Sequence, residues 1–251
     1  MTAKSTLQIL ALFAVAAALT VNCFAQNTNR RENTRPSPQK YPSSHYYNAD
    51  GSFNEKAAKD AYAELFRYHR YSLSRAVLEN IADVSLAGDK LWILDFGLGD
   101  FSNAGMAGIF FVNDKEHGYF GHEIYLLPYQ MIPEHFHLPA EDKPAKHEAW
   151  QVRNGSIWCF AEGGSEADLK NYPPEVAKAM KSQLDAKAIT AFKGIERKVG
   201  EMAVLSGLEA PHFMMAGPEG AIVTEYATFH SGSGLRFTNP SGFAGNTEAK
   251  K

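Results

Sequence analysis

The sequence is poor in cysteine and has no excess of positive charge. Only two of its 251 residues are cysteines, which is too few for a disulfide scaffold. Asp and Glu outnumber Lys and Arg by 28 to 25, so the net charge is −3 at neutral pH. Because a nucleic-acid-binding surface needs a basic excess, we expect no nucleic-acid partner. The hydrophobic fraction of 45% is ordinary for a globular chain with a substantial core.

Long apolar runs are absent outside the N-terminus. Residues 7–19 are apolar, follow Lys4 and precede a small-residue cleavage site, a pattern typical of a signal peptide. The run is shorter than the roughly 20 apolar residues that a membrane-spanning helix needs. We therefore predict a signal peptide over residues 1–25, an exported protein (periplasmic or extracellular), and no membrane attachment after cleavage. Anchoring as a lipoprotein through Cys23 is the alternative.

The composition and periodicity of the chain change several times after the predicted signal peptide. The first stretch is rich in Pro, Ser and Asn without periodicity, and the next has apolar residues at three- and four-residue steps. The predicted parts are a polar linker or arm over 26–53, a helical extension over 54–88 with a second helix at about 74–84, a β-barrel over 89–240, and a C-terminal tail over 241–251. Pro173 and Pro174 predict a helical insertion near 173–184 within the barrel.

Short β-branched and aromatic runs bounded by turn residues follow Asp89. The expected strands are 91–94, 108–112, 123–127, 149–152, 157–160, 188–192, 201–205, 212–215 and 221–228. Asn154-Gly155 between two of these runs favours a hairpin turn. Many short strands at close spacing indicate an all-β sandwich or small barrel, with the N-terminal helical arm packed on it.

The residue pair His135 and His137 is the most informative chemical feature. Residues two apart in a strand point to the same face, so both imidazoles are expected to project together. Glu148 lies on the next predicted strand, while its neighbour His147 must face the opposite side, so only one of these two can join the pair. His212 opens a later strand and supplies a fourth ligand. Three imidazoles and a carboxylate suit Mn, Fe, Ni, Co or Zn.

These residues resemble the first motif of the cupin superfamily, in which HxH, Glu and Gly recur at characteristic spacings. His135, His137, Glu148 and Gly155 match its positions, although Tyr129 stands where a leading Gly is expected. Pro211-His212 and Gly217-Pro218 match parts of the second motif. The resemblance implies a double-stranded β-helix (jelly-roll) barrel with these three His and one Glu as metal ligands.

A narrower resemblance is to the D-lyxose ketol-isomerase group of cupins. The residues that carry it are Gln130 to His137, Lys146 to Glu148 and His212 to Tyr226, within a similarity that spans about 90–240. The group implies a Mn-preferring aldose–ketose isomerase for a pentose or hexose of the D-lyxose or D-mannose type. It also implies a catalytic glutamate, matched here by Glu225, and in some members an assisting lysine, for which His122, Glu123 and Glu134 are candidate substitutes.

The isomerase chemistry needs a carboxylate that moves a proton next to a carbonyl and a divalent metal that stabilises the resulting charge. Glu225 serves this role if it faces the barrel interior; the alternative is that it faces solvent or pairs with Arg236. The predicted sugar-binding residues are Trp150, Phe213, Arg236 and His122, of which the aromatic ones fit a core role as well.

Two other functions fit the same ligands. One is a non-catalytic periplasmic carbohydrate- or metal-binding cupin, and the other is an Fe-dependent cupin dioxygenase. A homodimer paired through sheet edges is a further expectation.

Overall fold

The computed structural model describes residues 35–73 and 91–242. The predicted signal peptide, the second helix of the extension and most of the C-terminal tail lie outside these residues. The described helices are η2 (Ser43–Tyr46), α2 (Glu55–His69), η3 (Glu166–Asn171) and α4 (Pro174–Asp185). The strands are β1 (Trp92–Leu94), β2 (Met106–Asp114), β3 (Tyr119–Leu126), β4 (His135–His137), β5 (Glu148–Ala161), β6 (Lys193–Lys198), β7 (Met202–Val204), β8 (Phe213–Thr228) and β9 (Leu235–Phe237).

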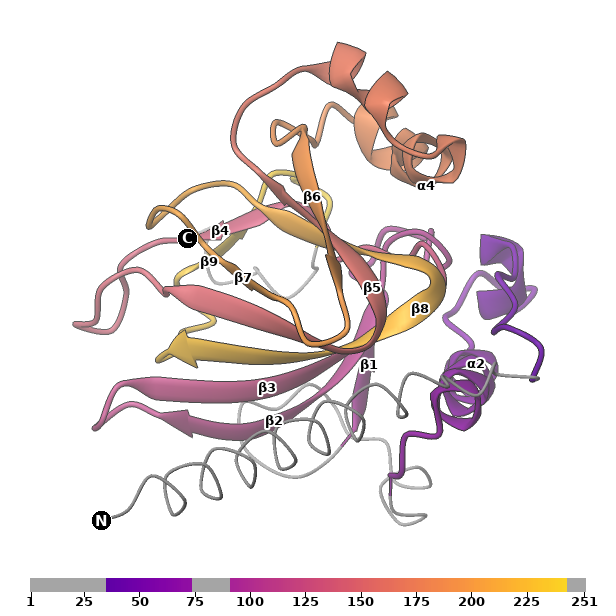
Figure 1. Cartoon of the computed structure of the whole chain (residues 1–251), viewed down its shortest axis with the longest axis horizontal. Helices are drawn as coiled ribbons and strands as arrows, with labels where there is room; N and C mark the ends of the chain where they lie inside the picture. Colours follow the sequence, from indigo (N-terminus) through magenta and orange to yellow (C-terminus); the bar gives the residue numbers. More distant parts are fainter. Residues whose placement is uncertain (1–34, 74–90, 243–251) are drawn as a thin grey trace, which may run out of the picture. The chain divides into compact units, whose positions relative to one another are not determined.

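Antiparallel pairing builds one large sheet and one small one. The large sheet has the order β1-β2-β3-β8-β5-β6, with β7 also paired to β5, and β4 pairs with β9 separately. Figure 1 shows β2, β3, β8 and β5 running side by side. Reciprocal backbone hydrogen bonds of 3.0 Å between His135 and His212 tie β4 to the start of β8. This bridge brings two histidines from distant parts of the sequence together.

Strand β5 runs unbroken through Asn154-Gly155, so the predicted hairpin is wrong. Gly155 has a φ of 73°, and the register with β8 shifts on both sides of it. These shifts are β-bulges, which bend a strand without ending it. Strand β8 likewise joins the two strands expected at 212–215 and 221–228, with Gly220 at φ 70° between them. The positive-φ glycines therefore bend two long strands instead of closing turns.

The strand expected at 188–192 is also wrong. The N–H groups of Thr190 and Ala191 both donate to the carboxylate of Glu134 at 2.8 Å. The Ala188 N–H donates to Gln183 at the end of α4. These bonds remove the donors that a strand ladder would need, and the strand β6 begins only at Lys193.

Two helices cover separate parts of the outside of the sheet. On α2, the side chains of Ala58, Ala61, Tyr62, Leu65 and Phe66 are buried and pack in one cluster with Ile109, Tyr125 and Ile222 of the sheet. On α4, Val176, Ala179 and Met180 pack with Phe160, Phe213 and Met215. Asn54 caps α2 by accepting a hydrogen bond from Ala57 N, and Pro174 occupies the first turn of α4.

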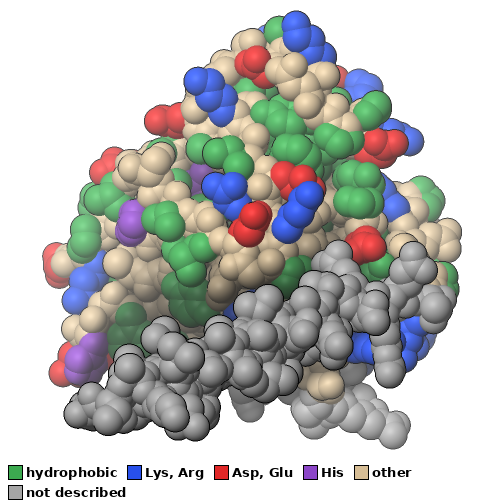
Figure 2. Space-filling model, viewed as in Figure 1, with side chains coloured by type: hydrophobic (Ala, Val, Ile, Leu, Met, Phe, Trp, Pro, Cys, Tyr) green, Lys and Arg blue, Asp and Glu red, His purple; other side chains and the backbone are tan. Residues whose placement is uncertain are grey.

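The segment before α2 is fixed to the sheet body by specific bonds. Lys40 Nζ donates to the carbonyls of Ser102 (2.7 Å) and Pro128 (3.1 Å), and Tyr46 is buried at 1% exposure. Within the described residues, no helix combines the length and apolarity needed to span a bilayer. On the face that Figure 2 shows, Lys and Arg side chains are interspersed with Asp and Glu.

Candidate metal centre and catalytic cavity

Strand alternation places His135 and His137 on one face of β4. Their ring centroids lie 5.4 Å apart, and the His135 ring lies 4.4 Å from that of His212 across the bridge. Glu148 begins β5 and is 2% exposed. One ligand atom from each of these four residues lies within 4.8 Å of the others. The structure thus brings together all four residues that the sequence analysis named as metal ligands.

Backbone carbonyls orient two of these imidazoles. His135 Nδ1 lies 2.9 Å from Pro133 O, and His212 Nδ1 lies 2.8 Å from Ala210 O. A ring nitrogen that donates to a carbonyl carries the proton, so Nε2 keeps its lone pair for a metal. Burial holds the pKa of His135 well below its ordinary value, which keeps that ring neutral and able to ligate.

The carboxylate of Glu148 lies beside the imidazole rings of His137 and His212. Its Oε1 lies 2.8 Å from His137 Nε2 and also 2.8 Å from Lys146 Nζ. Its Oε2 lies 3.3 Å from His212 Nε2. Burial tends to raise the pKa of Glu148, but the charges of Lys146 and His137 outweigh it and hold that pKa well below its ordinary range. His137 Nε2 is buried without a hydrogen-bond partner among the described residues and faces this carboxylate, which fits a site that a cation completes.

His147 faces away from this cluster, as strand geometry requires. Its backbone N–H donates to Thr228 Oγ1, and its ring nitrogen Nε2 lies 2.9 Å from Leu205 O. Of the two neighbours, Glu148 is therefore the one that joins the imidazoles.

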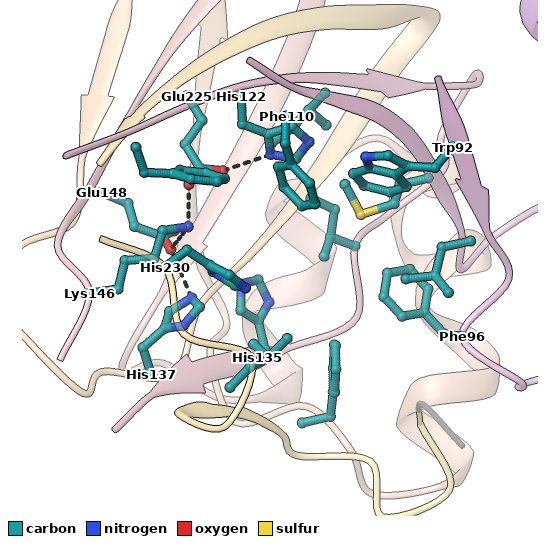
Figure 3. A pocket seen from close by; sticks show the side chains of 18 residues that line it. Trp92, Phe96, Phe110, His122, His135, His137, Lys146, Glu148, Glu225 and His230 are labelled. Carbon is teal, nitrogen blue, oxygen red and sulfur yellow. Dashed lines mark hydrogen bonds and ion pairs between the residues drawn. The ribbon is translucent and has the colours of Figure 1, made fainter. Parts of the chain in front are cut away.

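Glu225 on β8 points into the same cavity and is 4% exposed. It neither faces solvent nor pairs with Arg236. Its carboxylate forms an ion pair with Lys146, and its Oε2 lies 3.4 Å from His122 Nδ1 (Figure 3). Burial alone raises the pKa of Glu225, but the charge of Lys146 outweighs this effect and lowers it. The carboxylate is therefore ionised at neutral pH and able to accept a proton.

Lys146 is the functional residue that the sequence analysis missed. It is 5% exposed, and its Nζ contacts both Glu225 and Glu148, the latter at 2.8 Å. Burial lowers its pKa, but the two carboxylates more than compensate and raise it, so the side chain stays charged. Residue 146 lies in the loop before β5, where strand alternation does not set the direction of a side chain. The structure places neither Glu123 nor Glu134 at the cavity: Glu123 bonds Tyr125 OH and Glu134 bonds the 190–191 backbone.

Of the four predicted sugar-binding residues, only His122 lines the cavity. It is 3% exposed, and its Nε2 has no hydrogen-bond partner among the described residues. Trp150 packs on the His212 ring at 5.5 Å, and Phe213 stacks on Phe160 at 4.4 Å in the cluster beneath α4. Arg236 does not line the cavity, because its strand neighbours Leu235 and Phe237 point there instead.

The cavity has a volume of about 270 Å³. His230, which follows β8, completes its polar side and was also not foreseen; its buried Nδ1 lacks a hydrogen-bond partner within the described part of the chain. A cavity of this size with converging carboxylates, imidazoles and an ammonium group suits a small polar molecule bound beside a metal ion.

No protein-family model matches the chain. It is 31% identical over 161 residues to the D-lyxose/D-mannose isomerase of Thermosediminibacter oceani, and the match covers 64% of this chain and 83% of that protein. It is 29% identical over 185 residues to the D-lyxose ketol-isomerase of Cohnella laeviribosi, with 74% and 90% covered. The chain belongs to the D-lyxose ketol-isomerase family. This membership confirms the resemblance described above.

Solved structures similar to this member of the D-lyxose ketol-isomerase family support the same fold. The L-ribose isomerase of Acinetobacter sp. DL28 in complex with L-ribose has a TM-score of 0.50 at 15% identity and covers 77% of this chain and 92% of its own. That of Cellulomonas parahominis with L-ribose has a TM-score of 0.50 at 16% identity, covering 74% and 92%. The predicted all-β cupin barrel is confirmed.

Proposed function

We propose that this chain is a divalent-metal-dependent isomerase that interconverts an aldose and a ketose of the D-lyxose or D-mannose type. Membership of the D-lyxose ketol-isomerase family supports the reaction class. The observation that carries the site assignment is that His135, His137 and Glu148 of the candidate metal cluster line the same cavity as the Lys146–Glu225 pair.

The donor set fits a divalent cation. His135, His137, Glu148 and His212 offer three nitrogens and one carboxylate, which leaves coordination positions for substrate oxygens. When bound, the ion supplies Lewis-acid stabilisation for the negative charge that develops on the sugar oxygens next to the reacting carbons. We propose Mn²⁺ as the resident ion. The alternatives are Co, Fe, Zn and Ni, which the same three imidazoles and one carboxylate also suit.

Glu225 is proposed to move the proton between the two carbons. Its ionised carboxylate removes the proton from C2 of the open-chain aldose, whose carbonyl at C1 makes that proton weakly acidic. The same carboxyl then returns the proton to C1, which leaves the carbonyl at C2. The proton of the O2 hydroxyl moves to O1 in this exchange, and Lys146 and His122 are cavity-lining groups that can carry it.

Lys146 is proposed to keep Glu225 in its reactive state. Two carboxylates in one buried cavity disfavour each other's ionised form, and the ammonium between them removes this penalty. Lys146, Glu148 and Glu225 are 5%, 2% and 4% exposed, so their charges interact more strongly than they would in bulk water.

The test is formation of ketose from D-lyxose and D-mannose by the purified protein, metal-loaded and metal-stripped. Conversion that depends on the metal supports the proposal. Glu148→Gln is expected to weaken metal retention and turnover together, while Glu162→Gln, an exposed carboxylate nearby in sequence, changes neither. Sugar binding without conversion by the metal-loaded protein would instead indicate a binding protein, and O₂ consumption with Fe would indicate a dioxygenase.

Export and dimerisation are also proposals. The apolar run over 7–19 supports cleavage after residue 25, and mass spectrometry of the protein recovered from the producing cells measures it. Met202, Val204 and Tyr226 form an exposed apolar group on β7 and β8, which supports contact with a second copy. Native mass measurement tests that contact.

A further inference from the structure

The cavity has two chemically different halves. The polar half holds the imidazoles, carboxylates and the ammonium group described above. The other half is lined by Trp92, Leu94, Phe96, Met106 and Phe237, whereas Phe110 packs on His122 at 4.5 Å and Phe120 lies 4.4 Å below Lys146 Nζ, at the border with the polar half. Figure 3 shows Trp92 and Phe96 across the cavity from Glu148 and Lys146. A free sugar carries a hydroxyl on nearly every carbon, so a wholly apolar half is unexpected for it.

The apolar half offers almost no hydrogen-bond partners. Among its described lining side chains, the indole Nε1 of Trp92 is the one polar atom, and it is buried without a hydrogen-bond partner. Leu94, Phe96 and Met106 carry only carbon and sulfur beyond the backbone. Apart from His122 Nε2 at the border with the polar half, one substrate oxygen can therefore accept a hydrogen bond there, and a second would have none.

Packing fixes the shape of this half. Trp92, Phe96 and Met106 are 3%, 2% and 6% exposed, so little of their surface meets water. The Trp92 ring lies 5.0 Å from that of Phe110 and 5.4 Å from that of His122, and Phe96 packs edge-on against Phe237 at 5.4 Å. Rings held on several sides do not turn aside to admit solvent for an extra hydroxyl.

The proposed function fixes the direction in which a sugar lies, and the present inference rests on it. C1 and C2 must lie between the ligand cluster and Glu225, so the far end of the carbon chain extends into the apolar half. A terminal hydroxymethyl group there would lose its hydrogen bonds to water, whereas a terminal methyl group would gain apolar contact. We propose that the preferred substrate class is the 6-deoxyhexoses, aldoses that end in a methyl group, with the Trp92 N–H donating to a hydroxyl oxygen further along the chain.

The test compares 6-deoxy-D-mannose with D-mannose, which differ by one oxygen atom, and uses D-lyxose as the reference for activity. We expect kcat/KM of the metal-loaded protein to be at least about tenfold higher for the deoxy sugar. A discrimination of this size is typical for a single group that differs in an apolar pocket. Equal or lower kcat/KM for 6-deoxy-D-mannose, with D-lyxose turned over, would overturn the inference and leave the proposed function intact.

Two variants test the same half directly. Met106→Gln and Leu94→Asn each place an amide in the apolar half at similar side-chain size, and are expected to shift the preference toward D-mannose by about tenfold. Leu94 is only half-buried, so its variant remains informative if Met106→Gln does not fold. An unchanged ratio in a folded variant contradicts the inference.

Calorimetric titration of both sugars separates the two proposals. If no sugar is converted but the metal-loaded protein binds 6-deoxy-D-mannose about tenfold more tightly than D-mannose, the proposed reaction fails and the ligand preference stands. If there is neither conversion nor preference in binding, both are wrong.

Discussion

Lys146 and Glu225 form an ion pair in the buried cavity although they are 79 residues apart in the sequence. Lys146 lies in the loop just before β5, and Glu225 lies on β8. Both side chains extend into the cavity. Trp150 and Glu225 are direct partners in the β5–β8 register, which fixes how the two segments meet. Lys146 therefore connects Glu148 of the candidate metal cluster with Glu225, the proposed proton-transfer group.

Replacement of Lys146 by Met is predicted to affect both stability and catalysis. Without the ammonium group, two buried carboxylates face each other, so the pKa of Glu225 rises and its basic form is depleted. Loss of one partner from a buried charge cluster costs about 3–5 kcal/mol. We expect a drop of this size in the unfolding free energy of metal-free protein, and a large loss of kcat in the metal-loaded protein.

Lys181→Met is the matched control, because Lys181 forms an exposed pair with Asp185 on α4. Exposed pairs of this kind contribute about 0.5 kcal/mol or less. Urea unfolding and steady-state kinetics measure both variants. Equal stability and kcat of the two variants would mean that the Lys146 ammonium group is not needed.

Gly155→Ala is predicted to destabilise the barrel. A Cβ at this position would lie 2.0 Å from Gly220 O, and the residue has a φ of 73°. Gly118 has nearly the same φ of 75°, but a Cβ there would meet nothing within 4 Å. We expect Gly118→Ala to cost about 1 kcal/mol from backbone strain alone, and Gly155→Ala about 1–3 kcal/mol more from overpacking. Similar urea midpoints for the two variants would show that the close approach of β5 and β8 is not required.

Metal affinity is predicted to rise with pH through the neutral range. Burial lowers the pKa of His212, but its hydrogen bond to Glu148 outweighs this and raises the pKa above the ordinary value of 6.5. In metal-free protein His212 therefore keeps a proton to higher pH. The raised pKa stabilises the metal-free fold below pH 6.5, and this stabilisation is lost as the pH rises through the pKa of His212. The same proton must leave before His212 can bind a metal ion.

Isothermal titration with Mn²⁺ at about pH 6 and pH 8, in buffers of different ionisation enthalpy, measures this linkage. We expect tighter binding at the higher pH and release of about one proton per ion at the lower pH. His135 contributes no proton in this range, because burial holds its pKa well below 6.5. Affinity that is equal at both pH values, without proton release, would contradict the assignment of His212 as a ligand.

Three of the four candidate ligands could be predicted because their signals are local, whereas His212, 64 residues after Glu148, was predicted from its place at the start of a later strand. Strand alternation is enough to align His135 with His137 and to separate Glu148 from His147. The shape of the barrel was harder to predict, since Gly155 and Gly220 look like turn residues and their bulges are defined only by pairing between β5 and β8. Arg236 was misplaced because β9 could not be recognised from a run as short as Leu235–Phe237.

Lys146 and His230 escaped prediction for a related reason. Each lies in or beside a loop, where no periodicity says which way a side chain points. Their positions depend on where the segment after β4 and the end of β8 come together in three dimensions.

The most direct test of the account is proton NMR of D-lyxose in D₂O with metal-loaded wild-type protein and metal-loaded Glu225→Gln. The wild-type protein is predicted to remove the C2–H signal of the aldose as ketose appears. The variant is predicted to keep its metal and to slow this loss by about a hundredfold or more, the contribution typical of a positioned acid–base group. Loss of the C2–H signal at the wild-type rate in Glu225→Gln would contradict the proposed role of this residue. No loss in the metal-loaded wild-type protein would contradict the isomerase assignment itself.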